Sequence, residues 1–251
     1  MNRFTPRAIT LDLDDTLWPA RPTLLHAEKV LAAWLAERAP ATAALATPDW
    51  RKAARAAIAR DHPDRLHDLG FMRRESLRRA LVTAGEPASL AEPAFEVFLA
   101  ARQQVTLYDD VLAVLDDWAG RYRLVALSNG NADIGRIGIE RYFVASVSAH
   151  EAGHAKPDPR IFHEACRRAG VSPERTLHIG DDLELDVRAA RTAGLQALWV
   201  RRPDLAANGA ALADREALEP APTDRGAAES AHADLHSIDR LLRLAGRDRR
   251  D

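Results

Sequence analysis

Cysteine is almost absent from this chain, since Cys166 is the only one among 251 residues. A single cysteine excludes an intrachain disulfide and a metal cluster built on cysteines. Long apolar runs are lacking too. The chain contains no stretch of about 18 apolar residues, the length needed to span a bilayer. Residues 1–7 also lack the apolar run of a signal peptide. We therefore expect a cytoplasmic protein that makes no membrane contact.

An excess of one charge is also lacking. The chain has 35 lysines and arginines against 37 aspartates and glutamates, a formal net charge of −2. This balance gives no overall field to attract nucleic acid, and we interpret the one basic run, 243–250, as a solvated end. No Walker lysine loop and no Gly-x-Gly-x-x-Gly occurs, so nucleotide binding of those kinds has no support. A hydrophobic content of 47% is ample for a packed core. A small-molecule partner is expected, and the oligomeric state stays open.

The segment 8–18 is the most informative part of the chain. An alternating apolar run there ends in three carboxylates, Asp12, Asp14 and Asp15. The alternation predicts a buried strand that delivers acids at its C-terminal end, where parallel α/β sheets place their active sites. Asp12 and Asp14 face the same way in extended backbone, whereas Asp15 points away. A polar turn would explain one aspartate, but three acids need a positive partner.

Residues 18–104 are rich in Ala, Leu, Arg and Glu at helical spacing, with no convincing strand. They predict a separate helical module. Its helices are expected at 23–38 with Thr23 as N-cap, at 48–60, at 64–84 and at 89–104.

Strands and helices alternate after the helical module. We predict strands at 122–127, 142–147, 176–179 and 195–200, and helices at 107–120, 159–168 and 183–193. This alternation predicts an α/β fold, a doubly wound parallel sheet with helices on both faces. Residues 203–231 are patternless and predict a partly mobile loop. A last helix at 234–244, with Ile238, Leu241, Leu242 and Leu244 on one face, is expected to dock back onto the core.

Polar clusters follow three of the predicted strands. They are Asp12, Asp14 and Thr16; Ser128 and Asn129; and Gly180, Asp181 and Asp182 with Asp186. Because the ends of parallel strands meet at one edge of the sheet, these clusters should converge. Lys156 lies between them in the chain, in a proline-rich loop just before a helix, and supplies the missing positive charge.

The order and spacing of these residues resemble the haloacid dehalogenase-like (HAD) superfamily. Four motifs carry the resemblance: Asp-x-Asp-x-Thr at 12–16, the strand ending in Ser128, Lys156 followed by proline, and Gly-Asp-Asp-x-x-x-Asp at 180–186. The resemblance covers about residues 8–18 and 105–201. It implies a catalytic core from 1–17 and 105–251, interrupted by a helical cap at 18–104.

The resemblance also implies a phosphomonoester hydrolase. Asp12 would be the nucleophile that forms an aspartyl-phosphate, and Asp14 the general acid and base. Mg²⁺, which prefers hard oxygen ligands, would be held by Asp12, the backbone carbonyl of Asp14, and Asp181.

Other residues would assist the phosphate. Thr16, Ser128, the backbone N–H of Asn129, and Lys156 would bind its oxygens. Asp182 and Asp186 would orient Lys156 or metal-bound water.

Several local strings are similar to bacterial phosphatases of flavin mononucleotide and of 5-amino-6-(5-phosphoribitylamino)uracil, a riboflavin precursor. They are the segments 11–18 with Arg21, 128–131, 177–183 and 196–199. Trp18 and Arg21 are candidate substrate contacts. Sugar phosphates or nucleotides are alternative substrates, and a 2-haloacid dehalogenase is the alternative activity. Dehalogenases need neither a second acid nor a metal, so Asp14 and Asp181 favour phosphate hydrolysis. A binding protein without turnover fits the complete motif set least.

Three other features have plain structural explanations. The string from His150 to His154 matches a zinc-protease pattern, but that site needs a continuous helix, which Gly153 and the following prolines oppose; a loop is expected instead. The arginines at 73, 74, 78 and 79 predict a solvated helix face, with the alternative that one of them reaches a substrate. Cys166 should be buried in a helix and inert.

Overall fold

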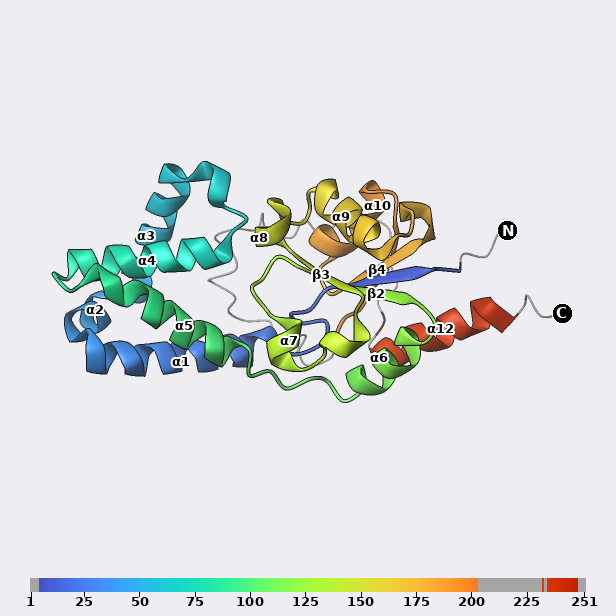
Figure 1. Cartoon of the computed structure of the whole chain (residues 1–251), viewed down its shortest axis with the longest axis horizontal. Coiled ribbons are helices and arrows are strands. Elements are labelled where there is room, and N and C mark those ends of the chain that lie inside the picture. Colours follow the sequence, from blue (N-terminus) through green and yellow to red (C-terminus); the bar gives the residue numbers. More distant parts are fainter. Residues whose placement is uncertain (1–4, 203–231, 233, 248–251) are drawn as a thin grey trace.

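A five-stranded parallel sheet forms the centre of the protein (Figure 1). The computed structural model describes residues 5–202, 232 and 234–247, so the predicted loop at 203–231 lies outside the described residues. The strands are β1 (Ala8–Leu11), β2 (Arg123–Ser128), β3 (Ala145–Ser148), β4 (Thr176–Gly180) and β5 (Gln196–Trp199). Their order is β3-β2-β1-β4-β5, so β1 lies where the sheet reverses its direction of growth. Open α/β sheets bind ligands at this switch point, and the predicted doubly wound sheet is confirmed.

Helices cover both faces of the sheet, as Figure 1 shows, with α6 and α12 on one side and α9 and α10 on the other. Successive side chains of a strand point to opposite faces. Ile9 and Leu11 therefore pack in the layer of α6 and α12, and Ala8 packs in the layer of α9 and α10. The core helices and short turns are α6 (Val111–Ala119), α7 (Ile134–Ile137), η3 (Glu140–Tyr142), α8 (Ala149–Ala152), α9 (Pro159–Ala169), η4 (Pro173–Arg175), the π-helical turn η5 (Leu183–Arg188), α10 (Ala189–Thr192) and α12 (Leu235–Arg247).

Between β1 and α6 the chain builds a helical unit, α1 to α5, that projects from one end of the sheet (Figure 1). Its elements are α1 (Ala20–Arg38), α2 (Pro40–Leu45), α3 (Pro48–Asp61), η1 (Pro63–Arg65), α4 (Leu69–Thr83), η2 (Ala88–Leu90) and α5 (Ala91–Arg102). The unit has its own apolar core, which includes Leu31, Leu81, Phe95 and Phe98. None of the helices in the described part of the chain combines the length and apolarity needed to cross a membrane.

Two predicted helix starts in this unit are wrong, and aspartates explain both. Helix α1 begins at Ala20 instead of Thr23, because the buried carboxylate of Asp15 accepts a hydrogen bond from Ala20 N at 2.8 Å. The predicted helix 64–84 is broken because Asp68 caps α4, accepting from Phe71 N at 2.8 Å. Aspartate side chains compete for backbone N–H groups, which favours helix starts over helix interiors.

Several core elements are also shorter than predicted. The helix expected at 107–120 is confined to α6, and the strand expected at 195–200 is confined to β5. The strand expected at 142–147 is confined to β3, because residues 140–142 form the turn η3. The helix expected at 183–193 divides into η5 and α10, and Asp182 caps the first of these.

Helix α12 docks on the core beside α6. Leu235, Ile238 and Leu242 are buried there, and Trp118 Nε1 donates to Asp239 Oδ1 at 2.9 Å. The prediction that Leu241 belongs to this face is wrong, since it is 44% exposed.

This difference supplies a matched pair of variants. Leu242 is 7% exposed and its neighbour Leu241 is 44% exposed. We expect Leu242→Ala to lower the free energy of unfolding by about 2–4 kcal/mol because it leaves a cavity, and Leu241→Ala by less than about 1 kcal/mol. Urea titration of both variants measures this, and equal losses would contradict the docking of α12.

Candidate active site

The predicted polar clusters meet at the carboxyl edge of the sheet. Asp12 follows β1, Ser128 ends β2, and Asp181 follows β4. Lys156, from the loop between α8 and α9, lies among them, and its Nζ donates to Asp12 Oδ1 and to Asp186 Oδ1 at 2.5 Å each. Asp12, Lys156 and Asp186 are all buried. Lys156 is therefore the positive partner of Asp12 that the sequence requires.

One ammonium shared by two buried carboxylates sets the charges of this site. Burial lowers the pKa of Lys156, but the charges of Asp12 and Asp186 outweigh it and hold that pKa above its ordinary value. The pKa values of Asp12 and Asp186 shift in opposite directions. Burial raises the pKa of Asp12 to about 7, which Lys156 only partly offsets. Burial acts the same way on Asp186, but there Lys156 and His178 prevail and its pKa falls. The charged form of Asp12 is thus stabilised less than that of Asp186.

The additional donors to Asp186 explain this divergence. His178 Nε2 lies 3.1 Å from Asp186 Oδ1, and Asp182 N donates to Asp186 Oδ2 at 3.0 Å. The other ring nitrogen of His178 lies 2.8 Å from Thr10 Oγ1, so the imidazole joins β1 to Asp186. Burial lowers the pKa of His178. The sequence analysis missed this residue, although a histidine within an apolar strand was a signal.

Asn129 holds the loop that carries Lys156. Its Nδ2 donates to the carbonyl of Lys156 at 2.9 Å, and its Oδ1 accepts from Lys156 N at 2.7 Å. The sequence predicted a contribution from the backbone N–H of Asn129 and missed this use of the side chain. Ser128 Oγ, the other predicted phosphate ligand of this strand end, accepts from Gly130 N at 2.9 Å.

Three carboxylates could hold a metal ion. Asp12, Asp181 and Asp186 each offer an oxygen, all within 4.8 Å of one another. Thr16 Oγ1 links two of them, donating to Asp12 Oδ2 at 3.1 Å and to Asp181 Oδ1 at 3.4 Å. Such hard oxygens suit Mg²⁺, and a divalent cation would compensate the charge at Asp12.

Two of the predicted metal ligands, Asp12 and Asp181, belong to this cluster of carboxylates, and Asp186 is an additional member. The third predicted ligand, the backbone carbonyl of Asp14, stays a prediction. Asp186 contacts Lys156, His178 and the backbone N–H of Asp182, so more donors compete with a cation there than at Asp12, which makes Asp12 and Asp181 the better side-chain ligands.

The chain passes between the sheet and the helical unit twice, and a side chain at each crossing holds the carboxylate of Asp14. At the first crossing, Trp18 Nε1 donates to Asp14 Oδ1 at 2.9 Å. At the second, Arg102 Nη2 donates to Oδ1 at 2.7 Å and to Oδ2 at 2.5 Å. Trp18, a predicted substrate contact, is fully buried against Asp14, so in this structure it supports the acid instead. No motif pointed to Arg102, the last residue of α5.

Two neighbouring residues serve the backbone. Asp182 Oδ1 accepts from Glu184 N and Leu185 N at 2.8 Å each, which caps η5. Asp182 is thus engaged away from Lys156, while Asp186 binds it directly. Arg21, the other predicted substrate contact, is an exposed residue in the first turn of α1.

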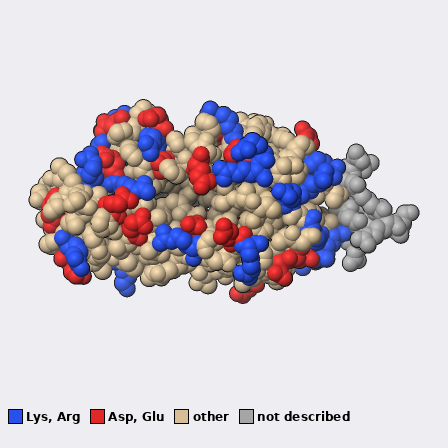
Figure 2. Space-filling view, viewed as in Figure 1, with Lys and Arg blue, Asp and Glu red and all other residues tan. Residues whose placement is uncertain are grey.

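A cleft of about 430 Å³ lies between the helical unit and the core, beside the end of β2, and appears as a recess near the middle of Figure 2. Positive and negative side chains are interspersed around it in that view. Its walls combine apolar and polar residues, among them Phe95, Leu99, Arg74, Gln103 and Asn131. Of the arginines on α4, Arg74 therefore lies on this cleft, with its guanidinium 4.0 Å from the Phe95 ring centroid.

The zinc-protease pattern does not form a zinc site. Helix α8 is a single turn that ends at Gly153, whose φ of +70° is left-handed, so His150 and His154 do not share a continuous helix. A loop is expected between His150 and His154, and the single helical turn α8 is the only departure from it. His150 Nδ1 lies 2.9 Å from Asp68 Oδ2 and so connects the core to the helical unit.

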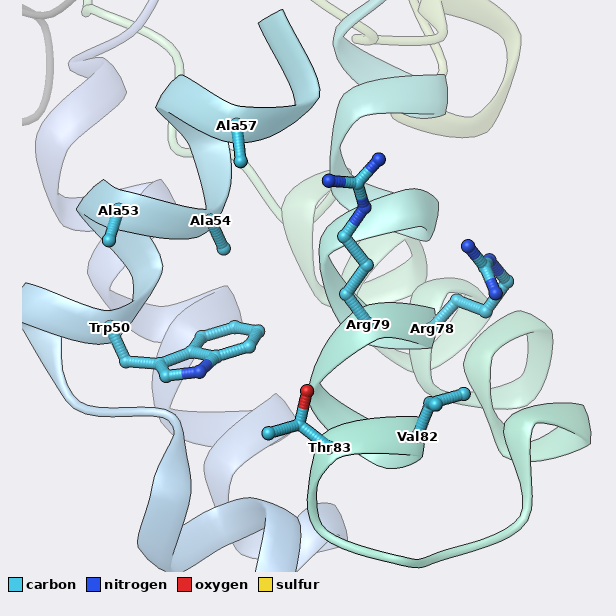
Figure 3. Close-up of a pocket in the computed structure, with 8 residues that line it drawn as sticks. All are labelled: Trp50, Ala53, Ala54, Ala57, Arg78, Arg79, Val82 and Thr83. Carbon is cyan, nitrogen blue, oxygen red and sulfur yellow. The ribbon is translucent and has the colours of Figure 1, made fainter. Parts of the chain in front are cut away.

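A second hollow, of about 350 Å³, lies between α3 and α4 and is lined by Trp50, Arg78, Arg79 and five smaller residues (Figure 3). It contains none of the predicted site residues. Arg78 and Arg79 both bind Glu75, which agrees with a solvated helix face. Cys166, as predicted, is buried in α9.

Comparison with known proteins finds a matching family model and similar phosphatases. A family model described as haloacid dehalogenase-like hydrolase matches residues 6–194. The chain is 31% identical over 198 residues to 5-amino-6-(5-phospho-D-ribitylamino)uracil phosphatase YigB of Escherichia coli, covering 77% of this chain and 83% of that one. It is 36% identical over 139 residues to a phosphoserine phosphatase of Thermus thermophilus, covering 53% and 56%.

Among solved structures, a 2-haloacid dehalogenase from Pseudomonas syringae superposes with a TM-score of 0.83 and 32% identity, over 96% of this chain and 99% of that one. The L-2-haloacid dehalogenase from Xanthobacter autotrophicus, at a TM-score of 0.62 and 21% identity, covers 95% and 99% and supports the fold alone.

Gly180 offers a test of the buried ion pair. A β-carbon there would lie 2.3 Å from Asp186 Cγ, whereas one at Gly120 would meet nothing closer than 3.6 Å. We expect Gly180→Ala to lower the free energy of unfolding by about 2–4 kcal/mol, because it displaces Asp186 from Lys156. Gly120→Ala should change it by less than about 0.5 kcal/mol. Equal unfolding free energies for the two variants would contradict the close contact at Gly180.

Proposed function

The chain belongs to the haloacid dehalogenase-like hydrolase family, and we propose that it is a Mg²⁺-dependent phosphomonoesterase that works through an aspartyl-phosphate on Asp12. One observation carries the proposal: Asp12 is bound to Lys156 and stands beside Asp181 in an acidic cluster, with a second acid, Asp14, two residues on. This combination provides a nucleophile, a cation site and a proton donor in one place. The phosphatases among the curated relatives support the same reaction.

The reaction has two displacements at phosphorus. Asp12 attacks, an Asp12–phosphorus bond forms, and the bond from phosphorus to the leaving oxygen breaks while Asp14 gives that oxygen a proton. Asp14 then takes a proton from water, which attacks phosphorus, breaks the acyl-phosphate bond and restores Asp12. A divalent cation held by Asp12 and Asp181 would supply the positive charge that keeps the nucleophile ionised and lets it approach a phosphate dianion.

The remaining site residues act on the phosphate oxygens. Lys156 offers a fixed positive charge because Asn129 clamps its backbone on both sides. We assign the hydroxyls of Ser128 and Thr16 and the backbone N–H of Asn129 to the same task. Preorganised donors of this kind stabilise charge that develops in the transition state.

The proposed substrate is a phosphate ester on a polyhydroxylated chain attached to a ring, with flavin mononucleotide or the phosphorylated ribitylaminouracil as first candidates. The 31% identity to the uracil-precursor phosphatase supports this choice. The cleft lies within the usual size of small-ligand sites, roughly 300–1,000 Å³. Phe95 and Leu99 offer an apolar wall for a ring, and Gln103 and Asn131 offer polar groups for hydroxyls. The helical unit would act as the cap, with Arg21 still a candidate contact.

A 2-haloacid dehalogenase is the second candidate, because a solved structure of that description is 32% identical to this chain. Its chemistry needs a carboxylate nucleophile but gives no task to Asp14 or to a cation at Asp181. The two acids therefore favour the phosphatase.

Two experiments test the reaction class: removal of the metal ion and replacement of the proposed nucleophile. Chelation with EDTA should abolish hydrolysis of p-nitrophenyl phosphate, and Mg²⁺ should restore it. Asp12→Asn should lower kcat by at least about 10³-fold, because an amide does not attack phosphorus, while its circular dichroism stays native. Turnover that persists in EDTA, accompanied by halide release from 2-chloropropionate, would support the dehalogenase instead.

The substrate is tested by a panel under one condition with Mg²⁺. Flavin mononucleotide or the ribitylaminouracil phosphate should exceed glucose 6-phosphate, phosphoserine and adenosine monophosphate in kcat/KM by at least about tenfold. Equal kcat/KM values across the panel would indicate a generalist phosphatase and refute the assignment.

A further inference from the structure

Arg102 is the best-buried arginine of the helical unit and the one that reaches the catalytic acids. It is 2% exposed although it ends a helix. Its Nη2 contacts both oxygens of Asp14, while its buried Nη1 has no hydrogen-bond partner. Leaving a buried donor unpaired is unfavourable. The guanidinium is therefore directed at Asp14 in spite of an unfavourable position for its other nitrogen.

The chain around Arg102 fixes where this guanidinium lies. The next residue, Gln103, donates from Nε2 to the carbonyl of Asn131 at 3.1 Å and accepts from Asp133 N at 2.8 Å. The end of α5 is thus tied to the loop after β2. That loop approaches Asp14 as well, since a β-carbon at Gly130 would lie 3.0 Å from Asp14 Oδ2 and 3.7 Å from Arg102 Nη2.

The proposed mechanism requires one defined direction for Asp14, because it must give a proton to the leaving oxygen while Asp12 attacks from the other side of phosphorus. A free aspartate on a turn would rotate about its side-chain bonds. Here Trp18 and Arg102 together hold it, one from each crossing of the chain.

We propose that Arg102 is a positioning residue that orients Asp14 toward the leaving oxygen, so that the placement of the helical unit determines whether the proton donor is aligned. The inference rests on the proposed function, since it presupposes that Asp14 is the acid. It assigns Arg102 no contact with the substrate. Trp18 acts in the same way from the first crossing.

The test compares two leaving groups. p-Nitrophenolate can leave as the anion without proton donation, whereas an alkoxide must be protonated as it leaves, so misalignment of Asp14 should affect an alkyl phosphate far more. Arg102→Gln should lower kcat for an alkyl phosphate by about tenfold or more beyond its effect on p-nitrophenyl phosphate. Trp18→Phe, which removes the indole N–H donor together with part of the buried ring system, should shift this ratio in the same direction. It serves as the second variant if Arg102→Gln fails to fold.

Arg38→Gln is the matched control. Arg38 also ends a helix of the helical unit but is 62% exposed and pairs with Glu37, so its variant should leave the ratio unchanged. In an Asp14→Asn background, Arg102→Gln should change the ratio by less than about twofold, because residues that act through one group are not additive.

Different results separate the two hypotheses. Equal losses on both substrates, or full additivity with Asp14→Asn, would overturn the positioning role of Arg102 and leave the phosphatase intact. An Asp14→Asn enzyme that still hydrolyses the alkyl phosphate at the wild-type rate would instead remove the acid from the proposed function.

Discussion

The structure depends on one ammonium group placed between two buried carboxylates. Lys156 bonds Asp12 and Asp186 equally. Asp12 also accepts from the Thr16 hydroxyl, whereas Asp186 is bound in addition by His178 and by the backbone of Asp182, so the charged form of Asp12 is the less stabilised of the two. Removing one partner of such a buried pair typically costs about 3–5 kcal/mol. The arrangement thus holds Asp12 in place while stabilising its charge only in part, which agrees with its proposed role as the nucleophile beside a metal ion.

Much of the surrounding fold maintains this ion pair. The order of the sheet puts β1 between β2 and β4, which brings three polar strand ends together. The Asn129 amide clamps the backbone of Lys156, and His178 joins Asp186 to the central strand. Gly180 leaves the space that Asp186 occupies. The helical unit contributes separately, through Arg102 at Asp14.

Sequence reasoning reached the sheet, its approximate strands and the pairing of acids with Lys156, because these follow from local alternation and from the rule that parallel strands end at one edge. It missed contacts between residues far apart in the chain. Arg102 and Asp14 are 88 positions apart, and His178 and Thr10 168 positions apart, and no local pattern marks such pairs. It also could not separate acids that look alike in sequence. It assigned Asp182 and Asp186 the same task, but Asp182 binds backbone N–H groups. Asp15, to which it assigned no task, binds a backbone N–H group as well.

Trapping the covalent intermediate tests the account most directly. The enzyme would be mixed with radiolabelled phosphate ester and Mg²⁺, quenched with acid within milliseconds, and digested for peptide mapping. The account predicts label on the peptide that contains Asp12, its release by hydroxylamine as expected for an acyl phosphate, and no label in Asp12→Asn. Turnover without covalent label at any quench time, or label on another residue, would contradict Asp12 as the nucleophile.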